Sequence, residues 1–523
     1  MRTKRTKAYN SFTLWHVALI VIAALTFAAR LVPGERTIDD AFITFRYARN
    51  LLSGHGFVYN PGERVQGTTT PLYTVLMAGE KALLPGIEYP LLALVTNALA
   101  DAASVVAIGW MCKRALDAPW LGIACASTWI ISPMSVTFAV GGMETSVFIL
   151  LLLLTVGTYA AGSAGWSAFC GALATLTRPD ALLIVLPLYA HMLWDRRRIP
   201  WREGALYLLA LAPWVLFATL YFGSPLTNSV VAKTAAYRLD RFSALIRLIQ
   251  HYATPFFENE TFSTRWVAVG GILYPFLSLL GGWTMVRRQG RTLPLVVYPW
   301  LYFAAFGVTN PLLFRWYLAP ILPMYILCIL YGALKIGTDV VGALQERWPA
   351  APTAGRIAGG LLVAAILGLY ANSWTLHPDH GPDRPAPEMA WFKLEQLYRE
   401  VTLDLKAREP LSDQTRIAAG DIGVVGWTSG ARILDTLGLV SPQSVPYYPL
   451  PADAYVISYA VSTDLVLAEQ PDYLILLEVY VRNTLLRSPE FSERYELARK
   501  WPTGIYGSDG MLVFRRRALA HGP

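Results

Sequence analysis

Two adjacent aspartates, Asp39 and Asp40, follow the first long apolar segment of the chain. Insertion of that segment into a membrane does not require carboxylates. A carboxylate held in position can act as a general base, and two adjacent carboxylates raise one pKa towards neutral pH. The pair also suits the start of a helix, with Asp39 as the N-cap and Asp40 in the first turn. The pair therefore predicts a catalytic base, a helix cap or both, and it leaves a divalent cation open as a cofactor.

Further polar side chains lie in segments that are otherwise apolar or close to apolar segments. Arginine and lysine can neutralise a phosphate, while amide, hydroxyl and carboxylate groups can bind the hydroxyls of a sugar. The candidate substrate-binding residues are Arg46, His55, Gln66, Thr68, Glu144, Arg178, Lys233, Arg315 and Tyr317.

The candidates in the first part of the chain also have structural interpretations. Arg46 suits a solvated helix surface, and His55 lies in the turn "SGHGF". Gln66 and Thr68 suit a loop and helix cap ahead of Pro71, and Glu144 suits the N-cap of an apolar helix.

The later candidates also admit structural roles. Arg178 interrupts an apolar segment, where a salt bridge to Asp180 would satisfy its charge. Lys233 and Arg315 lie close to apolar segments, where basic and aromatic side chains, including Tyr317, anchor a protein at the membrane interface.

The composition is that of an integral membrane protein. The chain has 523 residues, of which 54% are hydrophobic and 15% are charged, whereas about 25% is usual in soluble domains. The net charge of +8 comes mainly from basic residues in short gaps between apolar segments. That distribution reports membrane topology, so we expect no nucleic-acid partner. The four cysteines lack metal-site spacing.

Segment lengths and the distribution of basic residues predict about eleven transmembrane helices. The N-terminus is expected in the cytoplasm, and the loop 34–89, which contains the acidic pair, outside. Within this loop, "PLYTVLMAGEKALLPG" is expected to form a helix on the membrane surface. The expected spans are about 13–33, 90–112, 119–139, 145–161, 165–177, 180–194, 204–222, 266–286, 292–308, 317–334 and 357–373.

The last part of the chain changes in character. Residues 1–374 form the predicted membrane domain, and 375–523 form a predicted extracytoplasmic α/β domain. Short β-like runs such as "YLILLEVYV" alternate there with helical patterns. Asp421 and Asp435 suit turns at the ends of strands in this domain.

The acidic pair lies in a longer pattern, "DDAFITFRYARNLLSGHGFVYNPGERVQGTTTPLY", which is followed by "GGMET", "LATLTRPDALL" and "AAGDIGVVGWTSGARILDTLGLVSP". This layout resembles the GT-C class of membrane glycosyltransferases, in the bacterial branch that includes mycobacterial terminal arabinofuranosyltransferases. Many members of this branch have an acidic residue before the glycine where this chain has Gln66-Gly67.

The resemblance implies transfer of a sugar, with arabinofuranose as one option, from a polyprenyl-phosphate donor. The acceptor would be an envelope glycan, glycolipid or protein outside the plasma membrane. It also implies that the first acid of the pair, Asp39, is the base, and a single base with direct displacement predicts inversion at the anomeric carbon.

Other functions fit part of the pattern. A hexosyltransferase of the same class, such as a mannosyltransferase, is one alternative. A transporter or flippase for a lipid-linked sugar would explain the spans, and a scaffold for envelope assembly would explain the layout. The absence of a visible internal repeat disfavours the transporter.

Overall fold

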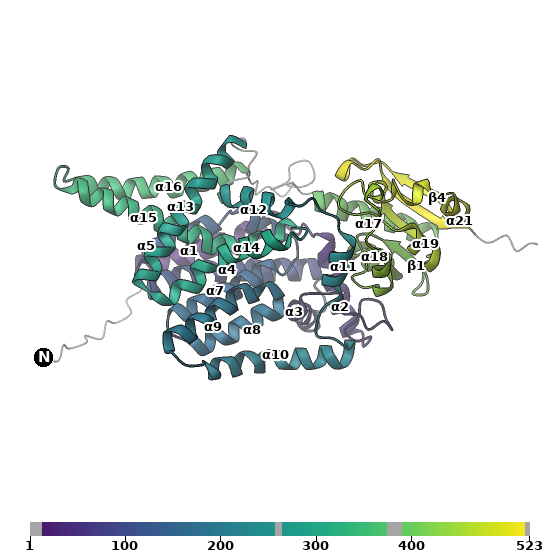
Figure 1. Cartoon of the computed structure of the whole chain (residues 1–523), viewed down its shortest axis with the longest axis horizontal. Coiled ribbons are helices and arrows are strands. Elements are labelled where there is room, and N and C mark those ends of the chain that lie inside the picture. Colours follow the sequence, from purple (N-terminus) through teal and green to yellow (C-terminus); the bar gives the residue numbers. More distant parts are fainter. Residues whose placement is uncertain (1–12, 257–263, 374–389, 518–523) are drawn as a thin grey trace, which may run out of the picture.

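The structure is a computed structural model that describes residues 13–256, 264–373 and 390–517. A bundle of long helices forms most of the molecule, and an α/β domain packs against one end of it (Figure 1). The basic cluster expected in the cytoplasm before residue 13 lies outside the described residues, as does the expected domain boundary at residue 374.

The bundle is built from long apolar segments, which form helices because each peptide group then finds its hydrogen-bond partner within its own segment. Each of the expected spans coincides with a helix or with a bent pair of helices. They are α1 (Leu14–Leu31), α4 (Tyr89–Ala115), α5 (Pro119–Trp129) with α6 (Pro133–Val140), α7 (Thr145–Ala160), α8 (Ala164–Thr177), α9 (Leu182–Arg196), α10 (Trp201–Phe222), α13 (Thr264–Arg288), α14 (Leu293–Thr309), α15 (Leu322–Gln345) and α16 (Ala351–Ser373).

Among the described residues, seven helices are long and apolar enough to cross a bilayer alone. The pair α5 and α6, bent by 56°, raises this number to eight if it counts as one span. The chain is therefore a multi-pass membrane protein by length and composition, and the eleven crossings stay a prediction.

A buried ion pair lies where α5 and α6 meet. Arg30 of α1 donates from Nε to Asp101 of α4 at 2.8 Å, and neither side chain is exposed. The guanidinium also donates to the carbonyls of Trp129 and Ile130, which the break leaves without helical partners. Arg30 therefore satisfies both a buried carboxylate and a broken helix.

Replacing Arg30 with methionine should destabilise the protein by about 3–5 kcal/mol, because Asp101 would be buried without its counter-charge. Unfolding in detergent micelles, followed by circular dichroism, measures this loss. The double variant R30M/D101L should recover part of it. Equal stability of R30M and the wild type would show that the ion pair between Arg30 and Asp101 does not contribute to stability.

Four shorter helices lie in the loops between the long ones. They are α2 (Asp39–Leu52), α3 (Pro71–Leu83), α11 (Asn228–Ala236) and α12 (Ser243–Ala253). Helices α2 and α11 contact the α/β domain, whereas α12 packs on α13 and α14. The segment expected on the membrane surface is α3, which begins at a proline, a residue preorganised for the first helical position. Helices α2, α3 and α11 lie at the junction between bundle and domain (Figure 1).

The C-terminal domain is an α/β fold, as predicted. Its sheet has the order β2-β1-β3-β5-β4, in which β1 pairs in parallel with β2 and β3, while β5 is antiparallel to β3 and β4. The strands are β1 (Arg416–Ala419), β2 (Arg432–Asp435), β3 (Tyr473–Leu477), β4 (Tyr495–Trp501) and β5 (Met511–Arg516). The helices are α17 (Ala390–Arg408), α18 (Gly423–Ser429), α19 (Thr463–Glu469), α20 (Glu478–Val481) and α21 (Pro489–Arg494).

Candidate active site

Asp39 joins the first loop to the C-terminal domain. Its two carboxylate oxygens accept hydrogen bonds from the backbone N–H groups of Gly423 and Val424, each at 2.8 Å. The side chain is only 5% exposed. The expected N-cap role is wrong, because Ile38 is the N-cap of α2 and Asp39 caps α18 of the other domain instead. Burial and the negative charge of Asp421 raise the pKa of Asp39 well above its usual value.

Arg46 makes a second connection of the same kind. It is 2% exposed, and its guanidinium donates to the carbonyls of Tyr59, Gly426 and Ala431. The expected solvated surface is therefore wrong. Its donors are also occupied by these carbonyls and by Asn60 Oδ1, so the expectation that Arg46 binds substrate is not supported by its contacts. Arg46 fastens α2 to the C-terminal domain.

Asp40, the neighbour of Asp39, differs from it in contacts and burial. Among the described residues it makes no hydrogen bond and no ion pair, and it is half-buried. Burial raises the pKa of Asp40, while the positive charge of Lys233 lowers it. A carboxylate whose oxygens are not engaged and whose pKa is raised is a stronger proton acceptor than an ordinary aspartate, which suits a general base. The accessible member of the pair is thus Asp40.

Glu144, Arg178 and Asp180 form a buried ionic cluster near Asp40. Arg178, between α8 and the short helix η1 (Pro179–Ala181), binds Asp180 at 3.0 Å, so the expected salt bridge is confirmed. Its Nη1 lies 3.5 Å from Glu144 and makes no hydrogen bond among the described residues. Glu144 is the N-cap of α7, as expected, but its side chain makes no capping bond.

Tyr317, in the short helix η4 (Arg315–Tyr317), lies against this cluster. The guanidinium of Arg178 is 4.5 Å from the centre of the Tyr317 ring. Lys233 of α11 interacts electrostatically with Tyr317 and Asp40, and its amine is 5.2 Å from the Phe314 ring. The structure therefore brings Asp40, Glu144, Arg178, Lys233 and Tyr317 together.

Arg315 lies beside this group on η4. Its charge acts on His251 of α12, together with that of Arg247. Burial, with these two positive charges, lowers the pKa of His251 to about 4. The imidazole is then neutral at physiological pH. Arg247 and Arg315 therefore make this edge of the site, which we call the rim, cationic.

Three of the other candidates occupy the loop before α3. Gln66 is buried, and its Oε1 has no hydrogen-bond partner among the described residues. Thr68 is buried and hydrogen-bonds to Thr70 at 3.1 Å. His55 is exposed in its turn, in line with its structural interpretation.

The sequence interpretation missed Asp421 as a member of the site. This carboxylate follows β1 and interacts electrostatically with Asp39 and Asp40. Tyr398 and Tyr480 donate to its Oδ2 at 2.9 and 3.3 Å. The only sequence signal for Asp421 was its position in a Gly-Asp pair directly after a buried strand. Such a pair also fits an ordinary turn. Asp435 occupies such a turn, as expected, and its carboxylate accepts hydrogen bonds from the backbone N–H groups of Leu437 and Val440.

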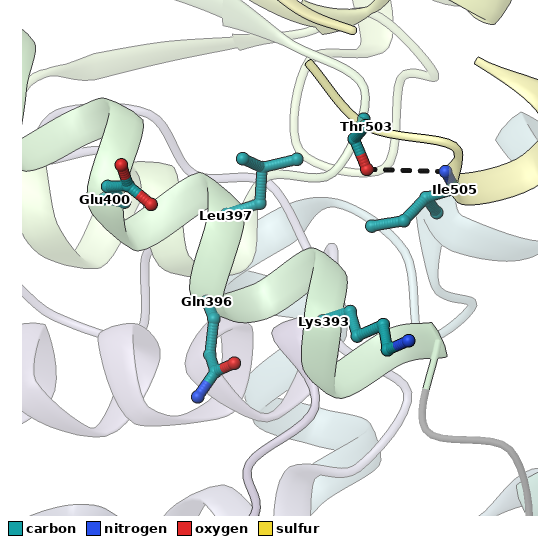
Figure 2. A pocket seen from close by; sticks show the side chains of 6 residues that line it. All are labelled: Lys393, Gln396, Leu397, Glu400, Thr503 and Ile505. Carbon is teal, nitrogen blue, oxygen red and sulfur yellow. Dashed lines mark hydrogen bonds between the residues drawn. The ribbon is translucent and has the colours of Figure 1, made fainter. Parts of the chain in front are cut away.

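A groove lies between α17 and the segment that follows β4. Figure 2 shows that Lys393, Gln396, Leu397 and Glu400 of α17 line it, opposite Thr503 and Ile505. Helix α17 thus presents a polar face to the groove and contributes Tyr398 to Asp421. Among the described residues, no group of three or more histidine, cysteine or acidic side chains is arranged to hold a metal ion.

Comparisons with known proteins agree with this layout. A family model described as a domain of unknown function (DUF8728) matches residues 391–515. The terminal β-(1→2)-arabinofuranosyltransferase of Mycobacterium tuberculosis (strain ATCC 25618 / H37Rv) is 29% identical over 245 residues, which are 42% of this chain and 38% of that protein. The chain thus matches well under half the length of this curated relative.

Two solved structures cover nearly the whole chain. ArnT from Cupriavidus metallidurans, bound to undecaprenyl phosphate, has a TM-score of 0.55 and 12% identity, and the match covers 98% of this chain and 100% of that one. The oligosaccharyltransferase AglB from Archaeoglobus fulgidus, in complex with an inhibitory peptide and a dolichol-phosphate, has a TM-score of 0.55 and 11% identity, with 98% and 75% covered. The chain has the fold of the GT-C membrane glycosyltransferases with a C-terminal α/β domain, and in sequence it resembles an arabinofuranosyltransferase.

Proposed function

We propose that this protein transfers a glycosyl residue, arabinofuranosyl by its sequence relative, from a polyprenyl-phosphate donor to an envelope glycan or glycolipid. The observation that supports this most is the free carboxylate of Asp40, with basic side chains near it, at the junction of bundle and domain. We place this junction on the outer side of the plasma membrane, with the N-terminus in the cytoplasm, as the basic loops predict.

The reaction needs one base and one site for a phosphate. The acceptor hydroxyl oxygen attacks the anomeric carbon and its proton passes to Asp40. The bond between that carbon and the phosphate oxygen breaks, and polyprenyl phosphate leaves with the electron pair. Direct displacement by one nucleophile inverts the anomeric carbon. Asp39 is a positioning residue in this mechanism, because both its oxygens are occupied and the fixed backbone of α2 holds Asp40 next to it.

The departing phosphate carries the negative charge that develops in the transition state. Lys233 and Arg315 are the cations that we assign to it, because cations placed where charge develops lower the barrier. Lys233 is the charge that acts on Asp40, and Arg315 belongs to the cationic part of the rim with Arg247. Arg178 is engaged with Asp180 and Tyr317, so we assign it to the shape of the sugar site.

Substituting either Lys233 with methionine or Arg315 with alanine should raise the apparent KM for the lipid-linked donor by about 10- to 100-fold, the scale of one lost charge-assisted hydrogen bond. Initial rates at varied donor concentration measure this change. Lys335→Met is the control, since Lys335 pairs with Asp339 on α15, a helix that carries none of the candidate site residues. A donor KM unchanged in both variants would contradict the assignment.

The proposed function is tested with purified wild-type protein and a panel of short-chain polyprenyl-phosphate sugars, including arabinofuranosyl and mannosyl donors. Release of polyprenyl phosphate in the presence of envelope extract is the readout. Release from one donor supports the proposal and names the sugar. Movement of labelled lipid across proteoliposomes without release would instead support a flippase.

A further inference from the structure

Asp421 differs from an ordinary turn residue in how its oxygens are used. The hydroxyls of Tyr398 and Tyr480 both donate to Oδ2, and among the described residues no hydrogen bond reaches Oδ1. Asp435, at the corresponding end of β2, uses both oxygens for backbone N–H groups of its own turn and is fully buried. Asp435 therefore closes a turn, whereas Asp421 is oriented by two tyrosines and keeps one oxygen available.

The position of Asp421 in the sheet points to a ligand. The chain runs from β1 to β2 on one side and then to β3 on the other side of β1. Connections that depart to opposite sides leave a crevice at the carboxyl ends of the strands, where open α/β sheets bind their ligands. Asp421 follows β1 and Tyr480 follows β3, so these two residues flank the crevice.

This end of the sheet lies next to the acidic pair of the first loop, because Gly423 and Val424 donate to Asp39. The charge of Asp421 acts on Asp39 and Asp40, which lie at the start of α2. Tyr237, which ends α11, interacts electrostatically with Asp421 and Asp40, and its hydroxyl makes no hydrogen bond among the described residues. Asp421 and Tyr237 thus both interact electrostatically with Asp40, and the three groups come from three separate segments.

The charge of these groups selects the kind of ligand. A carboxylate accepts hydrogen bonds from hydroxyls but repels a phosphate, so Asp421 suits a neutral polyol and disfavours the donor's phosphate. The cations assigned to that phosphate lie on α11 and η4 of the membrane domain. The groups that we assign to the donor thus belong to the membrane domain, whereas Asp421 belongs to the C-terminal domain.

We propose that Asp421 binds the acceptor: its free oxygen accepts hydrogen bonds from hydroxyls of a neutral glycan and holds the attacking hydroxyl against Asp40. The C-terminal domain then builds the acceptor half of the active site, with Tyr398 and Tyr480 as positioning residues for Asp421. This inference rests on the proposed transfer reaction and adds the class of the acceptor to it.

Ionisation of Asp421 gives a pH signature. Burial and the negative charges of Asp40 and Asp435 raise the pKa of Asp421 to about 6, against the hydrogen bonds from Tyr398 and Tyr480. Asp39 and Tyr237 face it as well. Only the ionised carboxylate accepts hydrogen bonds with all its lone pairs, so acceptor binding should tighten as the pH rises through about 6.

The first experiment compares Asp421→Asn with wild type at saturating donor. The acceptor KM should rise by at least about tenfold, as expected when a hydrogen bond to a charged group is lost, while the donor KM stays constant. The dependence of acceptor KM on pH near 6 should disappear in the variant. Asp453→Asn, an exposed aspartate of the same domain, should behave as wild type. An unchanged acceptor KM in Asp421→Asn, or a change confined to the donor KM, would overturn the inference.

The second experiment measures binding without transfer. Saturation-transfer NMR with a synthetic penta-arabinofuranoside, and with a mannopentaose, reports acceptor contact in the absence of any donor. Glycan binding that depends on Asp421, in a protein that transfers from no donor, would refute the transferase and keep the acceptor site. Normal transfer together with glycan binding that does not depend on Asp421 would support the transferase and refute the acceptor site. If Asp421→Asn does not fold, Tyr480→Phe should raise the acceptor KM in the same direction, and no change there overturns the inference.

Discussion

Replacing Asp40 with asparagine should lower the rate of glycosyl transfer by about 10²–10⁴-fold, the usual contribution of a positioned general base. The asparagine amide keeps the size of the side chain but cannot take the acceptor's proton. Because Asp40 makes no hydrogen bond or ion pair among the described residues, its removal should leave the fold and the donor KM nearly unchanged. Release of polyprenyl phosphate at saturating donor and acceptor measures the rate.

The matched variant is Asp39→Asn, which changes the neighbouring carboxylate in the same way. It should weaken the contact with α18, because an amide offers only one oxygen to the N–H groups of Gly423 and Val424. Limited proteolysis distinguishes this structural loss from a loss of chemistry. If Asp39→Asn is inactive yet resists protease like wild type, while Asp40→Asn keeps its rate, then Asp39 is the base.

Replacing Gly423 with valine should separate the C-terminal domain from α2 and abolish transfer. A Cβ at this position would lie 1.8 Å from the carbonyl oxygen of Asp39, and neither backbone has room to move without breaking the two hydrogen bonds. The close approach of α18 and α2 thus requires a residue without a side chain. One hydrophobic core runs through the bundle and the C-terminal domain, so we expect this substitution to loosen the packing between them as well as the contact with α2.

Cross-linking of engineered cysteines on α2 and α18 measures this undocking directly. Gly504→Ala is the control, because a Cβ at that exposed position of the same domain would contact nothing within 4 Å. Full cross-linking and full activity of the Gly423→Val variant would show that docking does not build the active site.

Features that depend on neighbouring residues were predictable from the sequence. The long apolar helices follow from the length of apolar runs, and the α/β domain follows from the change in periodicity. The pair Arg178 and Asp180 follows from their spacing of two residues at a break. Strand ends also followed, since Asp435 closes its turn with residues that lie within five positions of it.

Features that depend on distant partners were not predictable in the same way. By type and spacing, Asp39 suits a helix cap and Arg46 suits a solvated helix surface. Their partners, however, lie about 380 residues further along the chain. No local pattern reports such a partner. The same holds for Asp421, whose neighbours Asp39 and Asp40 belong to the other domain.

The separation between Asp39 and its partners has a consequence for biosynthesis. While the ribosome is still making the spans, the carboxylate of Asp39 and the guanidinium of Arg46 have none of the backbone groups of residues 423–431 to bind. Under the proposed function, the catalytic centre is then complete only after the last quarter of the polypeptide has been made and has docked. The nascent membrane domain would therefore not yet turn over lipid-linked sugars in the same membrane.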